Sequence, residues 1–397
     1  MNYRFSAKLG SFSSSAVREI LKLTQGNSII SFAGGLPAEE HFPVAAVSEA
    51  FGRVMEQGNK ALQYGLTEGY MPLREALCDR MARKGVKAKP ENMLLTTGSQ
   101  QAIDLLTRIY IDPGDVILVE RPTYLSALQV FRSYGAVPIS VDADLDGPDL
   151  DDLAAKIKQH KPKMFYVIPT FSNPTGKVWS EERRRAVLEA CRASDTLILE
   201  DDPYGELKFG DASRTYPSIL SLDEQTDNSC VVYTSTFSKT VAPALRTGWV
   251  IGDSKLIRAM SQAKQAADLH SSSLDQQTLY QLLAHFDLDG HIEFVRKEYE
   301  ARMRQMADLL KKHDWPGVKW QEPKGGMFFW LEFPESVNTT ELLKTCVELG
   351  VAFVPGVTFF AENAPTNCMR MNFTHNDYDA TISGMEKMTR AIESVLV

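Results

Sequence analysis

The chain has none of several features that mark special classes of protein. It has no apolar run long enough to span a bilayer, and its first residues have no apolar core typical of a secretory signal. Its five cysteines are far apart and form no CxxC pair, which argues against a disulfide framework and against a zinc site. It also has no basic stripe and no acidic tail, so nucleic acid is not expected as a partner. We expect a soluble, unprocessed protein of the reducing cytoplasm that binds neither a metal nor a membrane.

The order of apolar and polar segments predicts an α/β fold. Short runs rich in β-branched residues alternate with helix-like stretches, which is typical of a mostly parallel, doubly wound sheet. The strand-like runs cover residues 92–97, 116–120, 137–142, 163–169, 196–201, 230–237 and 248–252.

The pattern changes from about residue 253. Long helical stretches at 254–269 and 291–313 come first, and strand signals at 318–333 and 368–374 follow. With 397 residues, the chain is long enough for two or three structural units. We expect an N-terminal segment, 1–45, that joins the smaller domain and covers the substrate. A large α/β domain follows over 46–285, and a smaller α+β domain over 286–397.

Polar residues follow most of the predicted strands. Ligands of open parallel sheets bind at the carboxyl ends of the strands, so these positions are candidates for chemistry. They are Ser99 and Gln100 in "GSQQA", Tyr124 in "RPTY", Asn173 in "NPTG", Asp201 and Tyr204 in "EDDPYGEL", and Thr236, Ser238, Lys239 and Arg246 in "TSTFSKTVAPALR". Each also has an ordinary structural explanation: a helix cap, a packed ring, a tight turn, or a lysine that reaches water at its tip.

One ligand would use all of these residues together. Pyridoxal 5′-phosphate needs an amine for its aldehyde and a helix N-terminus, hydroxyls and an arginine for its phosphate. It also needs an aromatic plate under its ring, donors for its phenolic oxygen and a carboxylate for its ring nitrogen. Burial lowers the pKa of a lysine and makes it a nucleophile, which suits Lys239 to the first task. The sequence therefore predicts this cofactor.

The same ordered motifs resemble a known family. "GSQQA", "RPTY", "NPTG", "EDDPYGEL", "STFSKTVAPALRTG" and "MRMNF" are similar to the class I family of fold-type I aminotransferases. "SSSAVREILKLT", "ISFAGGLP", "LQYGLTEGY", "QAKQAADLH" and "KGGMFFW" resemble more narrowly the bacterial 2-aminoadipate and kynurenine aminotransferase group. The resemblance runs from about residue 13 to the end of the chain.

The resemblance implies a role for each matched residue that binds the cofactor. Lys239 would bind the cofactor aldehyde and, once the substrate amine displaces it, move the proton of the reaction. Asp201 would pair with the ring nitrogen, Tyr204 and Asn173 with the phenolic oxygen, and Tyr124 would stack on the ring. The phosphate would be held by Ser99, Gln100, Thr236, Ser238 and Arg246.

Other matched residues would bind the substrate or connect two subunits. Arg370 would pair with the α-carboxylate, and Gly35 would let the N-terminal segment pass close over the substrate. Tyr64 would reach the phosphate of a neighbouring subunit, which implies a homodimer. Ser15 and Arg18 lie three residues apart on one helical face, where Arg18 either binds a distal carboxylate or belongs to a solvated polar face.

The implied activity is a ping-pong transamination. An L-amino acid (2-aminoadipate, an aromatic amino acid or kynurenine, or a broad range) would give its nitrogen to a 2-oxo acid, for which we expect 2-oxoglutarate. A lyase with the same cofactor and a cofactor-binding sensor without turnover are the alternatives. Sensors of this kind carry a winged-helix domain first, and only about thirty residues precede "SFAGGLP".

Overall fold

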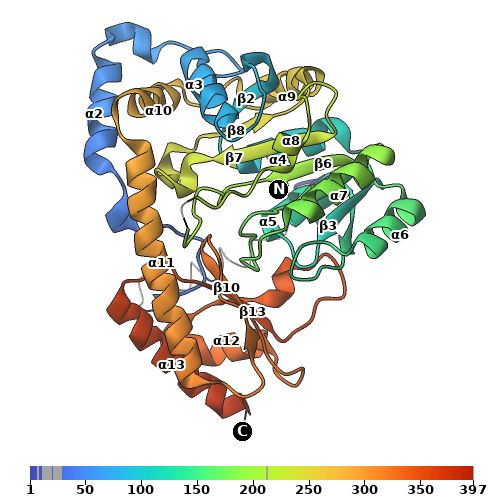
Figure 1. Cartoon of the computed structure of the whole chain (residues 1–397), viewed down its shortest axis with the longest axis vertical. Helices are drawn as coiled ribbons and strands as arrows, with labels where there is room; N and C mark the ends of the chain where they lie inside the picture. The colour runs from blue at the N-terminus through green and yellow to red at the C-terminus, as the bar shows by residue number, and fades with distance from the viewer. Residues whose placement is uncertain (7–8, 11–19, 21–28, 212, 397) are drawn as a thin grey trace.

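A computed structural model describes residues 1–6, 9–10, 20, 29–211 and 213–396. Ser15 and Arg18 lie outside the described residues. Within the described part, a seven-stranded sheet and a four-stranded sheet lie one above the other in Figure 1, joined along one side by a long helix. The predicted α/β class is therefore confirmed.

The seven-stranded sheet has the strand order β2-β8-β7-β6-β5-β3-β4. Its strands are β2 (Met93–Thr96), β3 (Val116–Glu120), β4 (Val137–Val141), β5 (Met164–Val167), β6 (Leu197–Asp201), β7 (Val231–Thr236) and β8 (Gly248–Ile251). Every strand lies inside one of the predicted runs. Most of their residues are buried because helices cover both faces of the sheet, which explains the nearly continuous apolar runs.

Strand β8 departs from the parallel pattern. It pairs antiparallel with both β2 and β7, whereas β3, β4, β5, β6 and β7 pair parallel to one another. Only residues 237–247 connect β7 to β8, which is shorter than the dozen or more residues that a parallel crossover needs. The chain therefore turns back beside β7, and this turn carries Lys239 and Arg246.

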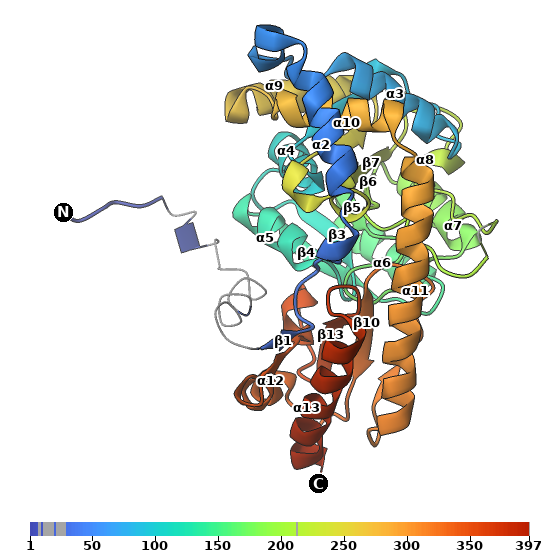
Figure 2. The same cartoon turned by 90° about the vertical axis from the view of Figure 1, so that its left-hand side faces the viewer.

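Two sets of helices cover the two faces of the sheet. One apolar cluster joins the sheet to α4 (Ser99–Tyr110), α5 (Leu125–Ser133) and α9 (Ser254–Asp268). The other joins it to α2 (Val44–Met55), α3 (Met71–Ala82), α6 (Leu150–His160), α7 (Glu181–Ala193), α8 (Ile219–Leu222) and α10 (Ser273–His285). The result is a three-layer arrangement, which Figures 1 and 2 show from two sides.

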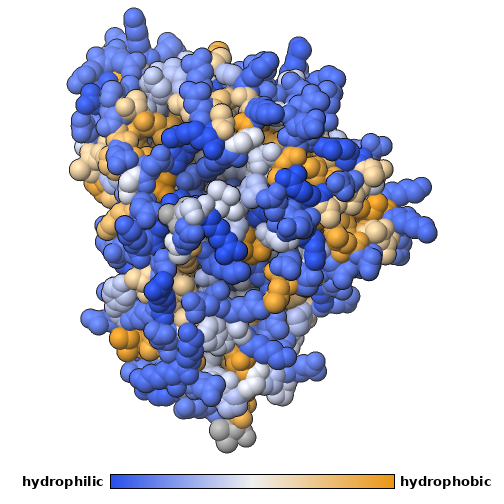
Figure 3. Space-filling view, in the orientation of Figure 1, coloured by the Kyte–Doolittle hydropathy of each residue, from blue (hydrophilic) through white to orange (hydrophobic). Residues whose placement is uncertain are grey.

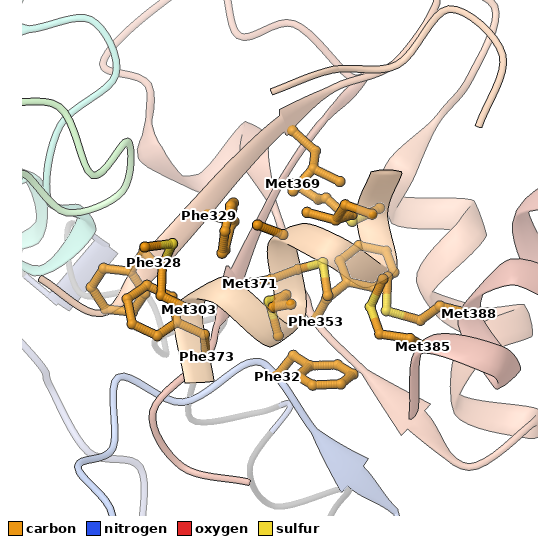
Figure 4. Packing of buried hydrophobic residues seen from close by; sticks show 14 of the residues in the cluster. Phe32, Met303, Phe328, Phe329, Phe353, Met369, Met371, Phe373, Met385 and Met388 are labelled. Carbon is orange, nitrogen blue, oxygen red and sulfur yellow. The ribbon is translucent and has the colours of Figure 1, made fainter. Parts of the chain in front are cut away.

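The second sheet has the strand order β12-β13-β10-β9 and is antiparallel throughout. Its strands are β9 (Lys319–Trp320), β10 (Phe328–Glu332), β12 (Val354–Pro355) and β13 (Cys368–Asn372). It packs with α11 (Leu288–His313), α12 (Thr339–Glu348) and α13 (Tyr378–Leu396) around a core rich in phenylalanine and methionine, drawn in Figure 4.

The described part of the N-terminal segment packs with this second sheet. Strand β1 (Ile30–Ser31) pairs parallel to β11 (Val351–Ala352), and Phe32 lies in the core of Figure 4. Asn372 N donates to Phe32 O at 2.8 Å, so β13 also holds this segment. The domain boundaries at residues 45 and 285 stay a prediction.

Two further properties bear on the sequence analysis. All five cysteines are free thiols. Among the helices in the described ranges, none has both the length and the apolar character that a membrane span requires.

Candidate active site

Lys239 lies just after the end of β7, in the short 3-10 turn η5 (Phe237–Lys239). Its Nζ donates to Gly35 O at 2.7 Å, so the lysine contacts the N-terminal segment. Burial, together with the positive charges of Arg370 and Arg246, lowers the pKa of Lys239 to about 8. An amine with this pKa is substantially neutral near pH 8, as a nucleophile and a proton acceptor must be.

The N-terminus of α4 and the turn after β7 form a cradle of donors. Gly98, before α4, has a φ of 74°, and a Cβ there would lie 2.6 Å from Arg246 Nη2. Arg246 Nη1 donates to Ser238 Oγ at 3.3 Å, and the hydroxyl oxygens of Ser238 and Thr236 are 2.9 Å apart. Ser99 and Gln100 stand in the first turn of α4, whose free N–H groups favour an anion. The cradle therefore suits a phosphate group.

Asp201 ends β6 with one oxygen bound and one free. Tyr166 Oη donates to its Oδ2 at 2.8 Å. Its Oδ1 is buried and has no hydrogen-bond partner among the described residues. Burial and the negative charge of Asp202 raise the pKa of Asp201 to about 7, against the opposing effect of the Tyr166 hydrogen bond. A buried carboxylate oxygen is costly to leave unpaired, so Oδ1 calls for a cationic or N–H partner.

Arg370 and Asn173 form a second polar group of the site, apart from the anion cradle's own hydrogen bonds. Arg370 Nη1 donates to Asn173 Oδ1 at 2.7 Å and Nη2 to Ala33 O at 2.6 Å. Its guanidinium carbon is 4.2 Å from the centre of the Phe328 ring and 5.0 Å from that of Phe359. Burial lowers the pKa of Arg370 to about 10, which leaves the guanidinium charged at neutral pH. Its buried Nε has no partner in the described part of the chain, so one donor is available to a ligand.

Tyr124 and Tyr204 lie among these charged groups. Burial raises the pKa of both phenols. Asp201 and Arg370 act on both pKa values, and Arg246 acts on that of Tyr124. Asn173 forms a hydrogen bond with Tyr204, whose ring meets Phe328 edge-on with the ring centres 5.8 Å apart. Both tyrosines therefore lie close to Asp201 and Arg370.

The residues predicted to contact the substrate or a neighbouring subunit lie in different places. Gly35 contacts the site through its carbonyl, and a Cβ on it would lie 3.2 Å from Phe328 Cζ. Tyr64 lies apart, with 78% of its surface exposed and its ring 5.7 Å from that of His270. Ser15 and Arg18 have no described position.

Tyr166 is a functional residue that the sequence motifs did not point to. The run at 163–169 that contains it predicts a strand and no more. A buried phenol needs a hydrogen-bond partner, however, and the partner here is the carboxylate on the neighbouring strand. The need of a buried phenol for a hydrogen-bond partner was therefore the one sequence signal that could have pointed to Tyr166.

The donors and acceptors of this site fit pyridoxal phosphate. The free Oδ1 of Asp201, the depressed pKa of Lys239 and the anion cradle match its ring nitrogen, its aldehyde and its phosphate. Residues 28–382 match the family described as aminotransferase class I and II. The chain belongs to this family.

Individual relatives agree over nearly the whole chain. It is 39% identical to aromatic-amino-acid aminotransferase 1 of Thermococcus litoralis, over 98% of this chain and 94% of the relative. It is 37% identical to 2-aminoadipate transaminase of Thermus thermophilus, over 99% and 97%.

Solved structures agree as well. Kynurenine aminotransferase of Pyrococcus horikoshii has a TM-score of 0.92 at 38% identity, with 98% of this chain and 97% of that chain covered. The α-aminoadipate aminotransferase LysN of Thermus thermophilus has a TM-score of 0.92 at 36% identity, with 99% and 98% covered. The protein is thus an aminotransferase that uses pyridoxal phosphate and acts on amino acids. Its predicted fold-type I architecture is confirmed.

Proposed function

We propose that Lys239, Asp201 and Arg370 are the main functional residues of this aminotransferase. The observation that carries this assignment is the buried, unpaired Oδ1 of Asp201, in electrostatic contact with Tyr124 and Tyr204. Bound cofactor supplies an aldehyde for the substrate amine and a ring that accepts electrons from the substrate Cα. Asp201 would hold the proton of the ring nitrogen through Oδ1.

Lys239 has two tasks in this proposal. Its amine would hold the cofactor through the aldehyde. Its Nζ, when free, would take the proton from the substrate Cα, a task that suits an amine with a pKa of about 8. Gly35 O, its hydrogen-bond partner, keeps the amine near the segment that covers the substrate.

The remaining residues bind and orient. Tyr204 and Asn173 would bind the phenolic oxygen, and Tyr124 would lie against the ring. Ser99, Gln100, Thr236, Ser238 and Arg246 would hold the phosphate. Arg370 would bind the α-carboxylate and so fix which bond of Cα stands perpendicular to the ring, which favours loss of the Cα proton.

We propose 2-aminoadipate, aromatic amino acids and kynurenine as candidate donors, with 2-oxoglutarate as acceptor. The relatives named above support these donors. The rings of Phe328 and Phe359 beside Arg370 would suit an apolar or aromatic side chain. Arg18, with Ser15, would bind a distal carboxylate.

We further propose a cytoplasmic homodimer in which Tyr64 reaches the neighbouring subunit. Figure 3 shows apolar surface at the upper left, over α2 and α10 of Figure 1. The large apolar side chains that α2 exposes are Val44, Phe51 and Met55. Exposed apolar surface of this kind favours burial against another subunit. Five free cysteines fit a reducing compartment.

The near-visible absorption spectrum of the purified protein tests the proposal. We expect a band of lysine-bound cofactor that 2-aminoadipate, glutamate, kynurenine, phenylalanine or leucine converts to the amine form without any keto acid. The order of the donors then identifies the side-chain pocket. In Lys239→Ala the band should be absent, and the turnover rate should fall at least about 10³-fold.

Other outcomes would contradict it. Full turnover by Lys239→Ala would remove the lysine from its role. A band that returns unchanged after each donor, with ammonia released, would indicate a lyase. A band that no donor changes would indicate a sensor.

A further inference from the structure

Tyr166 and Asp201 face each other across two neighbouring strands of the sheet. Strands β5 and β6 pair parallel, with Tyr166 opposite Leu199. Asp201 follows Leu199 by two residues, so the side chains of Leu199 and Asp201 point to the same face of the sheet. The Tyr166 side chain stands on that face as well, and its hydroxyl meets Asp201 Oδ2 at 2.8 Å.

The phenol of Tyr166 has little freedom to move. Its side chain is fully buried, and its ring meets Phe131 of α5 edge-on, with the ring centres 5.5 Å apart. Burial and the charge of Asp201 raise the pKa of Tyr166 well above its usual value, so the hydroxyl keeps its proton. It is therefore a fixed donor at every working pH, and Asp201 Oδ2 is its acceptor.

This single bond decides the orientation of the Asp201 carboxylate. With Oδ2 held by Tyr166, Oδ1 is the oxygen left without a partner in the described structure. Without the bond, the carboxylate could rotate and would lose its one hydrogen-bond donor in a fully buried place. A hydrogen bond to a charged group stabilises the charged form, so its loss favours the protonated acid.

We propose that Tyr166 is a positioning residue for transamination: its hydroxyl keeps the Asp201 carboxylate ionised and directs Oδ1 toward the cofactor ring. This inference rests on the proposed role of Asp201. Asp202, Tyr124 and Tyr204 are the other ionisable groups that act on this carboxylate or respond to it, and Glu120 of β3 acts on Tyr166.

The chain contains a matched control one strand away. Tyr233 of β7 is also buried, and its hydroxyl donates to Asp202 Oδ2 at 2.9 Å. Asp202 accepts a second bond, from Gly205 N at 2.9 Å, and has no place in the proposed site. Tyr166→Phe and Tyr233→Phe therefore remove the same atom from the same kind of buried pair, and only the first touches Asp201.

Equilibrium dialysis of the full-length holoenzyme between pH 5 and pH 9 tests the inference without measuring turnover. Cofactor affinity should fall as pH decreases, because Asp201 becomes protonated. In Tyr166→Phe this fall should begin about one to two pH units higher. That is the pKa shift expected from the loss of one hydrogen bond to a charged group. Tyr233→Phe should not move this fall to higher pH, because loss of its hydroxyl can only weaken the negative charge of Asp202 beside Asp201. The cofactor phosphate titrates in the same range but equally in all variants, so the difference between profiles is informative.

Steady-state kinetics gives a second readout. Tyr166→Phe should lower kcat at least about tenfold with little change in the KM of the donor, because Arg370 still binds the carboxylate. An unchanged pH profile in Tyr166→Phe, or equal shifts in both variants, would overturn the inference. Asp201→Asn distinguishes a failure of the proposed role of Asp201 from a failure of the inferred role of Tyr166. If this variant leaves cofactor affinity unchanged, the proposed role of Asp201 fails. If it weakens affinity while Tyr166→Phe does not, only the role of Tyr166 fails.

Discussion

At the scale of single residues, Arg370 illustrates how a buried cation can be kept ready for a ligand. Removing a guanidinium from water is costly unless most of its donors are paired. Two carbonyl-type oxygens and two aromatic faces offset that cost here, and Nε has no partner among the described residues. A planar guanidinium held in this way matches a carboxylate in a fork that a lysine cannot reproduce.

Arg370→Lys should therefore raise the KM of every amino-acid donor by about 10- to 100-fold while the cofactor stays bound. The charge is kept, but the planar arrangement of donors is lost. Steady-state kinetics with phenylalanine measures the change, and the cofactor band is the check on folding. 2-Phenylethylamine, which lacks the carboxylate, should react at the same slow rate with both proteins. An unchanged KM for phenylalanine would remove Arg370 from the substrate site.

Several residues of the candidate site could be predicted together from the sequence because they follow predicted strands. Asn173, Asp201 and Lys239 each follow an apolar run, and parallel strands bring such residues to one edge. Tyr166 could not be found in this way, because it lies within a strand and its role depends on strand register. The free Oδ1 of Asp201 and the ring partners of Arg370 are likewise properties of packing.

At the scale of elements, the loop after β6 is held by an ionic cluster. Glu206, two residues after Tyr204, pairs with Arg80 of α3 at 3.2 Å and with Lys84 in the turn that follows α3. Arg296 of α11 donates through Nε to Glu206 O at 2.6 Å. Burial alone would raise the pKa of Glu206, but Lys84, Arg80 and Arg296 hold it at about 2. The cluster thus ties α3, the turn after it and α11 to the loop that carries Tyr204.

Glu206→Gln should lower the free energy of unfolding by roughly 2–3 kcal/mol at pH 7. A carboxylate with a depressed pKa stabilises the fold above its unfolded pKa of 4.5, and that contribution is lost as pH falls toward 2. The gap in denaturation midpoint between variant and wild type should therefore narrow between about pH 4.5 and pH 2. Glu181→Gln, which breaks an exposed pair with Arg185, should change stability by no more than about 0.5 kcal/mol. A gap that stays constant with pH would contradict the role of the cluster.

Strands and helices were predicted correctly where the apolar pattern extended over several residues. The seven strands of the large sheet and helices α9 and α11 follow from apolar runs and helical periodicity. Strands β1, β11 and β12 were not predicted, because two residues carry no periodicity and their pairing is set by partners far along the chain. The antiparallel direction of β8 followed from the length of its connection to β7, which the sequence analysis did not use.

At the scale of the whole molecule, the position of Tyr64 raises the question of which active site it serves. Its ring stands beside His270 and is largely exposed, as are Leu62 and Leu66 on either side of it. Within one subunit, no interaction joins Tyr64 to Lys239 or Arg246 among the contacts of the described chain. In the proposed homodimer, a two-fold axis would let each Tyr64 complete the site of the other subunit.

Mixed dimers of two defective variants distinguish the two arrangements. Tyr64→Phe removes the hydroxyl proposed to bind the phosphate, and Lys239→Ala removes the reactive amine. If Tyr64 acts across the interface, a mixed dimer has one site with both wild-type residues and one site with neither. Equal mixing should then restore about a quarter of wild-type activity at limiting cofactor, because half of the dimers are mixed and half of their sites are intact. If Tyr64 serves its own subunit, every mixed site is defective, and activity stays at the average of the two parent variants.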